Sequence, residues 1–72
     1  ASAVATYQKL AAATPRDPSV QLELADAATT AGDTATAIKA YKTFLRIAPD
    51  DPTAVEVRRI LKQLEASATP TG

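Results

Sequence analysis

The sequence repeats itself at a distance of 34 residues, and this internal period constrains the fold more than any other feature. Moving the chain by one period places Tyr7 on Tyr41 and Pro15 on Pro49. The other matched pairs are Ala3 with Ala37, Val4 with Ile38, Leu10 with Phe44, Asp17 with Asp51, Pro18 with Pro52 and Ser19 with Thr53. A fixed period of this size is typical of stacked repeats, in which each unit buries its apolar face against its neighbours.

The segments between the prolines carry apolar residues at spacings of three and four, which is the pattern of amphipathic helices. The expected apolar positions are Ala3, Val4, Tyr7, Leu10, Ala11, Val20, Leu24, Ala27, Ala28, Ala31, Ala37, Ile38, Ala40, Tyr41, Phe44, Leu45, Ile47, Ala54, Val57, Ile60, Leu61 and Leu64. We therefore predict four helices, at residues 1–14, at residues 18–31, between Gly32 and Pro49, and at residues 52–66.

Proline, glycine and small polar residues mark the ends of these helices. The expected turns are residues 14–17, 32–33 and 49–51, and the expected N-cap residues are Ser2, Asp17 and either Asp33 or Thr34. Pro18 follows Asp17 at the first helical position, where a missing backbone N–H costs nothing. Gly32 can adopt the positive φ with which many helices end.

Ala37, Tyr41 and Pro49 form the pattern A-x3-aromatic followed by P, and Leu24 and Ala25 precede them as a Leu-small pair. This arrangement resembles the tetratricopeptide repeat family, whose motif on a 34-residue helix-turn-helix is W-x2-L-G-x2-Y, then A-x3-F, then P. The resemblance covers residues 2–65. The motif and structural positions assigned in this way are Leu24, Ala25, Gly32, Ala37, Tyr41 and Pro49, with Ala3, Tyr7 and Pro15 one period earlier.

The resemblance implies an all-α domain in which antiparallel helix-turn-helix repeats stack as a short right-handed solenoid of four helices. Its expected parts, within a domain at residues 1–66, are the second helix of a preceding repeat at 1–14, one full repeat at 18–51 and a C-terminal capping helix at 52–66, followed by a disordered tail at 67–72. In this interpretation the sequence begins in the middle of a repeat. Arg58, Arg59 and Lys62 place charge where internal repeats pack together, which suits a terminal helix with a polar outer face.

The composition argues against several classes of function. Eight basic and eight acidic residues give a formal net charge of zero, so we expect no nucleic acid or anionic membrane surface as a partner. Without Cys or His, the chain has no disulfide framework and no cysteine metal site. No apolar run approaches the ~20 residues of a membrane span. We expect no cofactor, no metal and no membrane contact from this segment, and the sequence does not indicate a compartment.

The groups that could carry chemistry have simpler explanations. Ser2 and Ser19 stand at helix starts, where capping accounts for them, and Ser67 falls in the expected tail. Asp50 and Asp51 lack the glycine turn and the further spaced ligands of a calcium loop. We therefore predict that the chain is not an enzyme.

The resemblance further implies that a protein or peptide binds on a concave face formed mainly by the first helix of each repeat. The candidate positions are Ser19, Leu22, Asp26, Thr29 and Thr30 on the second helix, and Thr53, Glu56, Ile60, Gln63 and Leu64 on the fourth. The best-known subgroup of the family clamps a C-terminal carboxylate with Lys and Asn. Leu22, Asp26, Glu56 and Ile60 stand at those positions here, so a carboxylate ligand is disfavoured.

Two functions of different classes remain open at this stage. The first is a non-catalytic interaction module that binds a peptide or protein segment on its concave face. The second is a structural oligomerisation unit, which would self-associate through the side of Val4, Tyr7 and Leu10 that lacks a partner helix, or through Ile60 and Leu64 at the other end.

Overall fold

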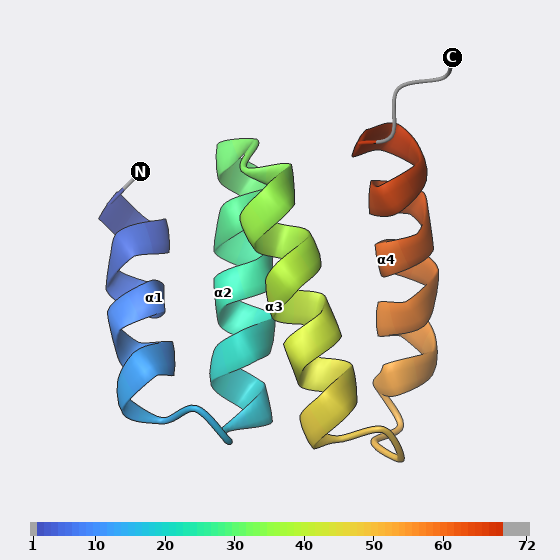
Figure 1. The fold of residues 1–72 in the computed structure, drawn as a ribbon, viewed down its shortest axis with the longest axis horizontal. Helices are drawn as coiled ribbons and strands as arrows, with labels where there is room; N and C mark the ends of the chain where they lie inside the picture. The colour runs from blue at the N-terminus through green and yellow to red at the C-terminus, as the bar shows by residue number, and fades with distance from the viewer. Residues whose placement is uncertain (1, 69–72) are drawn as a thin grey trace.

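The computed structural model describes residues 2–68 and contains four α-helices joined by short turns (Figure 1). The helices are α1 (Ser2–Ala13), α2 (Pro18–Ala31), α3 (Thr34–Ile47) and α4 (Ala54–Ala68). Successive helices run in opposite directions, and the described residues include no β-strand. The predicted all-α fold of four antiparallel helices is therefore confirmed.

Close backbone contacts within the described part of the chain join only helices that are adjacent in the sequence. α2 packs against α1 and against α3, and α3 also packs against α4. The molecule measures 38 × 30 × 15 Å along its principal axes, so the helices form a flattened stack (Figure 1). This order of contacts is the one expected of helical repeats, and the right-handed twist of a longer solenoid stays a prediction.

The two turns that are related by the 34-residue period have the same capping hydrogen bond. The backbone N–H of Ser19 donates to Asp17 Oδ1 at 3.0 Å, and the N–H of Thr53 donates to Asp51 Oδ1 at 2.8 Å. α2 begins at Pro18 as predicted, whereas α4 begins at Ala54 and not at residue 52. The reason is a tight first turn, in which the N–H of Ala54 donates to the carbonyl of Asp51 at 2.8 Å.

The hairpin turn between α2 and α3 is built from one left-handed residue and one N-cap. Gly32 has φ 79°, and its N–H donates to the Thr29 carbonyl while the N–H of Asp33 donates to the Ala28 carbonyl, which is the Schellman arrangement. The hydroxyl and the backbone N–H of Thr36 donate to the Asp33 carboxylate at 2.7 and 3.2 Å. These bonds hold the pKa of Asp33 below its ordinary value of 3.8. Asp33 is therefore the cap of α3, and Thr34 is its first helical residue.

The core is a single apolar cluster in which small residues let the helices approach closely. Its buried members are Val4, Ala11, Val20, Leu24, Ala25, Ala28, Ala37, Ala40, Tyr41, Phe44, Ala54, Val57 and Leu61. Phe44 and Val57 are its largest fully buried side chains. The predicted apolar faces supply this whole cluster apart from Ala25, which was assigned as a motif position.

Several details of the sequence prediction are wrong. Ala3, Leu10 and Ala31, all assigned to apolar stripes, are exposed, whereas the polar Gln21 is buried. Val4, predicted on the side of α1 that lacks a partner helix, is buried because it packs against the core. Leu10 lies on a side of α1 that no helix covers, and Ala31 is the last residue of α2 before the glycine turn. Ser2 belongs to α1 itself and does not precede it.

The C-terminal end of α4 also differs from the prediction. The helix ends at Ala68, so the first two residues of the predicted tail are helical. Ala has the highest helix propensity, which favours this extension of the last turn. The remainder of the predicted tail lies outside the described residues.

The left-handed conformation of Gly32 predicts a measurable cost for any β-branched residue at this position. A Cβ at residue 32 would meet no atom within 4 Å, so the cost arises from φ alone. We expect Gly32→Val to lower the free energy of unfolding by about 1–2 kcal/mol, as measured by urea denaturation with far-UV circular dichroism. Gly32→Asn is the matched control and should cost less, because Asn tolerates positive φ. Equal stability of the two variants would contradict this account of the turn.

Candidate functional site

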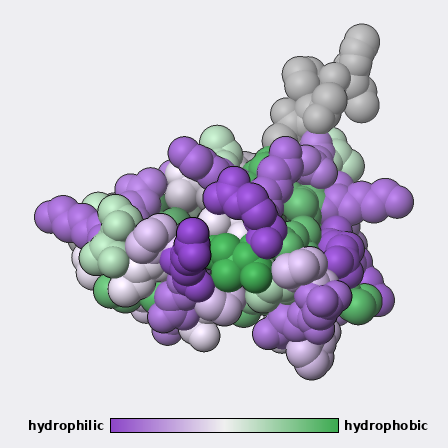
Figure 2. Space-filling model, turned by 60° about the horizontal axis from the view of Figure 1, so that its bottom comes forward, coloured by the Kyte–Doolittle hydropathy of each residue, from purple (hydrophilic) through white to green (hydrophobic). Residues whose placement is uncertain are grey.

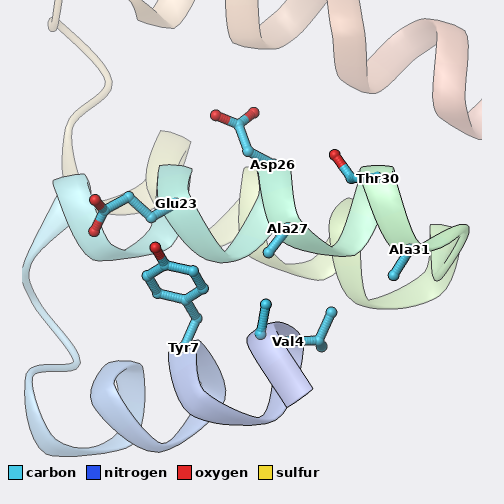
Figure 3. Close-up of a pocket in the computed structure, with 8 residues that line it drawn as sticks. Val4, Tyr7, Glu23, Asp26, Ala27, Thr30 and Ala31 are labelled. Carbon is cyan, nitrogen blue, oxygen red and sulfur yellow. The ribbon is translucent and has the colours of Figure 1, made fainter. Parts of the chain in front are cut away.

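A groove lies between α1 and α2. Its lining residues are Ala3, Val4, Tyr7, Glu23, Asp26, Ala27, Thr30 and Ala31, and they enclose about 550 Å³. In the close-up, Val4 and Tyr7 point from α1 towards α2, and Ala27 and Ala31 point back towards α1 (Figure 3). We call this cavity the α1–α2 groove.

The α1–α2 groove combines an apolar floor with an acidic rim. Its floor consists of small or aromatic side chains from both helices, whereas Glu23 and Asp26 are the charged residues that line it. Both carry negative charge, and no Lys or Arg is among the lining residues. The groove therefore favours an apolar ligand surface that has a positive charge at its edge.

The position of Asp26 on this rim is fixed by a contact with α3. The hydroxyl of Tyr41 donates to Asp26 Oδ1 at 3.3 Å, and the Tyr41 side chain is almost fully buried. The pKa of Tyr41 is raised above its ordinary value of 10.0, mainly because the ring is buried. The neighbouring negative charge of Asp26 raises this pKa further. One hydrogen bond thus joins the aromatic motif residue of α3 to the rim of the groove.

Among the predicted binding residues of α2, two line the α1–α2 groove. These are Asp26 and Thr30. Ser19 and Thr29 are exposed elsewhere on the helix, and Leu22 is half-buried and packs against the core. The α2 half of the predicted face is therefore on the surface, apart from Leu22.

The predicted residues of α4 form a separate surface, since α4 makes its close backbone contacts with α3 and not with α2. Glu56 and Gln63 are exposed, and Thr53 is exposed in the turn before the helix. Ile60 and Leu64 are half-buried and pack against the core.

The sequence prediction did not assign several residues of the α1–α2 groove to a binding site. Glu23 was not assigned to any role. Ala27 and Ala31 were assigned to the helix core and Ala3 to a motif position. Val4 and Tyr7, by contrast, were predicted to form, with Leu10, the side of this helix that would self-associate. The 34-residue period indicated that one side of α1 lacks a partner helix, but it did not show that Glu23, Ala27 and Ala31 of α2 complete a groove there.

Other cavities lie elsewhere on the described surface. A second cavity, of about 460 Å³, lies on α1, α2 and α3 and includes Gln8, Gln21 and Lys39. Seen from the end that carries the turns, the surface has an apolar area bordered by hydrophilic residues (Figure 2). Another hollow is lined by Pro15, Arg16, Arg46 and Ile47.

The charged residues on α3 and α4 mostly have structural partners or face solvent. Lys42 Nζ lies 3.2 Å from Glu65 Oε2, and Arg59 Nη1 lies 3.6 Å from Glu56 Oε1. A guanidinium nitrogen of Arg58 donates to the Pro49 carbonyl at 3.1 Å. Both ion pairs are exposed, and such pairs contribute little to stability.

Within residues 2–68, no cluster of three or more His, Cys, Asp or Glu side chains is arranged to hold a metal ion. None of the helices in this range is both long and apolar enough to cross a membrane.

A family model described as Tetratricopeptide repeat matches residues 18–64. The matched range contains the complete α2–α3 hairpin and most of α4. No curated protein and no solved structure gives a significant match.

The Tyr41 to Asp26 contact predicts a specific dependence of stability on pH. Because the pKa of Tyr41 is raised by folding, its contribution to stability is complete below about pH 10 and is lost as the pH rises above that value. Tyr41→Phe should cost about 0.5–1.5 kcal/mol near neutral pH. Urea denaturation of both proteins at increasing pH should show this difference shrinking above about pH 10. A difference that stays constant would exclude the proposed linkage.

Proposed function

This chain belongs to the tetratricopeptide repeat family, and we propose that it is a non-catalytic module that binds a segment of another protein in the α1–α2 groove. Repeats of this family typically mediate protein–protein interactions. The proposal assigns the contact to Tyr7 and Ala27 on the floor of the groove and to Asp26 and Thr30 on its rim.

The observation that carries the proposal is the combination of an accessible apolar floor with charge confined to one edge. Apolar surface supplies most of the free energy of protein association, and a charged rim gives orientation and selectivity. The groove volume of about 550 Å³ lies within the range of pockets that hold ligand side chains.

The exposed residues of the predicted concave face extend this proposed surface. Ser19 and Thr29 of α2 would contact a ligand that continues beyond the groove. Glu56 and Gln63 of α4 would contact it only if the ligand also spans α3, because α2 and α4 make no close backbone contact. Ile60 and Leu64 are less suitable, since they pack partly against the core.

One observation favours the alternative function, self-association. The side chain of Leu10 is 42% exposed on α1, and a large exposed apolar side chain next to an open groove is a common feature of subunit contacts. A concentration series in analytical ultracentrifugation separates the two functions. A monomer at all concentrations supports the interaction module, and a reversible dimer or larger species supports the oligomerisation unit.

The binding function can be tested with a peptide library displayed on phage and selected against the immobilised 72-residue chain. We expect the enriched peptides to bind the wild-type chain and to lose at least about tenfold in affinity for Thr30→Arg. The reason is that Thr30 is exposed and lines the groove, so an arginine there adds a long charged side chain at the rim and removes no core side chain.

Ala66→Arg is the matched control, because it adds the same side chain at an exposed position of α4. Its affinity should equal that of the wild type, and circular dichroism should show that both variants are folded. Enriched peptides that bind Thr30→Arg as tightly as they bind Ala66→Arg would refute the assignment of the groove.

A further inference from the structure

The second cavity lies between α1 and α3, and α2 forms its floor. α2 makes close backbone contacts with both helices, whereas α1 and α3 make none with each other within the described residues. The cavity encloses about 460 Å³, and its apolar lining consists of Ala11, Ala12, Leu24, Ala35 and Ala40. It shares no lining residue with the α1–α2 groove. We call it the α1–α3 cavity.

The α1–α3 cavity occupies the place at which the family motif has a large aromatic ring. In the pattern W-x2-L-G-x2-Y, the Trp stands three residues before the Leu. Leu24 fills the Leu position here, so Gln21 stands where the motif has Trp. Both residues line the cavity. A carboxamide is much smaller than an indole ring and most of the apolar lining is alanine, so the cavity is open where a Trp at residue 21 would fill it.

Gln21 brings an unpaired hydrogen-bonding group to the floor of the cavity. The residue is only 6% exposed, and no hydrogen bond among the described residues involves its carboxamide. None of the described residues, however, has a fully buried side-chain nitrogen or oxygen without a partner. The carboxamide therefore reaches the cavity that Gln21 lines. Its donor and acceptor favour a ligand with a polar edge, because a polar group shielded from water is costly without a partner.

The two walls of the cavity are free of acidic residues. α1 has the sequence SAVATYQKLAAA and α3 the sequence TATAIKAYKTFLRI, so their charged residues are all basic. Lys39 lines the cavity and is exposed, and its ammonium has no carboxylate partner among the described residues. Glu23 and Asp26 of α2 line the other groove instead. The charge at the rim of the α1–α3 cavity therefore favours an anion.

We propose that the α1–α3 cavity binds a small aromatic carboxylate. The aromatic ring takes the place of the motif Trp against Ala11, Leu24 and Ala40, and the Gln21 carboxamide forms a hydrogen bond with the polar edge of the ring. The carboxylate pairs with Lys39 at the rim. A volume of about 460 Å³, an apolar lining and a few convergent polar groups are the usual features of a small-molecule site. The site is separate from the α1–α2 groove and goes beyond the proposed protein-binding function.

Indoleacetate is the probe that tests this site, because it combines an aromatic ring, a ring N–H and a carboxylate. Titration of the isotope-labelled 72-residue chain, followed by heteronuclear NMR, should give saturable shifts of the backbone amides of Ala11 and Ala40 and of the Gln21 side-chain amide. The absence of saturable shifts overturns the inference. Shifts confined to Tyr7 and Thr30, which line the α1–α2 groove, overturn it as well.

Two comparison ligands separate the contributions of the ring and the carboxylate. Indole lacks the carboxylate and should bind about two- to fivefold more weakly, which is the usual effect of an exposed ion pair. Cyclohexylacetate keeps the carboxylate but replaces the flat ring by a thicker one without an N–H, and it should bind at least about fivefold more weakly. If either comparison ligand binds as tightly as indoleacetate, the inference is wrong.

Gln21→Trp restores the aromatic ring of the motif within the chain and should close the cavity. We expect at least about tenfold weaker binding of indoleacetate, with the helix content unchanged by circular dichroism. Ala12→Leu narrows the same cavity from an exposed position and should weaken binding about fivefold, even if Gln21→Trp fails to fold. Ala5→Leu is the matched control, since Ala5 is exposed on α1 and does not line the cavity. Wild-type affinity of Ala12→Leu, or of a folded Gln21→Trp, refutes the assignment.

Lys39→Gln tests the charge at the rim of the cavity. This variant should bind indoleacetate about two- to fivefold more weakly and should bind uncharged indole as the wild type does. Lys9→Gln is the matched control, because Lys9 is exposed on α1 and does not line the cavity, and its substitution changes the net charge by the same amount. Equal losses of indoleacetate affinity in the two variants exclude pairing of the carboxylate with Lys39.

The phage-selected peptides distinguish a free ligand from a side chain of a partner protein. If their affinity falls for Gln21→Trp but not for Thr30→Arg, a side chain of a partner occupies the cavity, and the inference of a free aromatic acid is wrong. If their affinity falls only for Thr30→Arg while indoleacetate binds the α1–α3 cavity, the chain has two separate sites, as inferred. If no peptide is enriched and indoleacetate still binds, the proposed function fails and the inference stands.

Discussion

The contact between α2 and α3 is the interaction on which the rest of the structure depends. Ala25, Ala28 and Ala37 are fully buried there, and side chains of this size permit a short distance between the helix axes. Gly32 and Asp33 make the turn that brings these faces together, since one ends α2 and the other caps α3. α1 and α4 are then added to the outer sides of an existing pair, one on each helix.

Local signals explain why the fold could be predicted from the sequence. Proline, glycine and aspartate determine the backbone conformation and the capping of the turn in which they stand. The positions of Pro18, Gly32 and Asp17 therefore indicated where helices start and end. The candidate site depends on neighbours instead. Leu10 and Phe44 have the same place in the pattern, and only the presence or absence of a covering helix makes one exposed and the other buried. The alanine residues did not indicate the site either, because alanine suits both a buried helix core and the floor of a groove.

The two ends of the stack differ in chemical character. α4 presents charged residues such as Arg58 and Lys62 on its outer side, where they remain solvated. α1 presents Tyr7 and Leu10 next to an apolar groove. Burial of apolar area is favourable and burial of unpaired charge is not, so further contacts are favoured at the α1 end and opposed at the α4 end.

The restriction of contacts to sequence neighbours has a consequence for how stability is distributed along the chain. Within residues 2–68, no close backbone contact joins helices that are not adjacent in the sequence, so each helix is protected only by the helices beside it. α2 and α3 each have two neighbours, whereas α1 and α4 each have one. Amide hydrogens should therefore exchange most slowly in the central hairpin and faster towards both ends. Any protein that docks on α1 would give it a second neighbour and would shift the region of slowest exchange towards the N-terminal end.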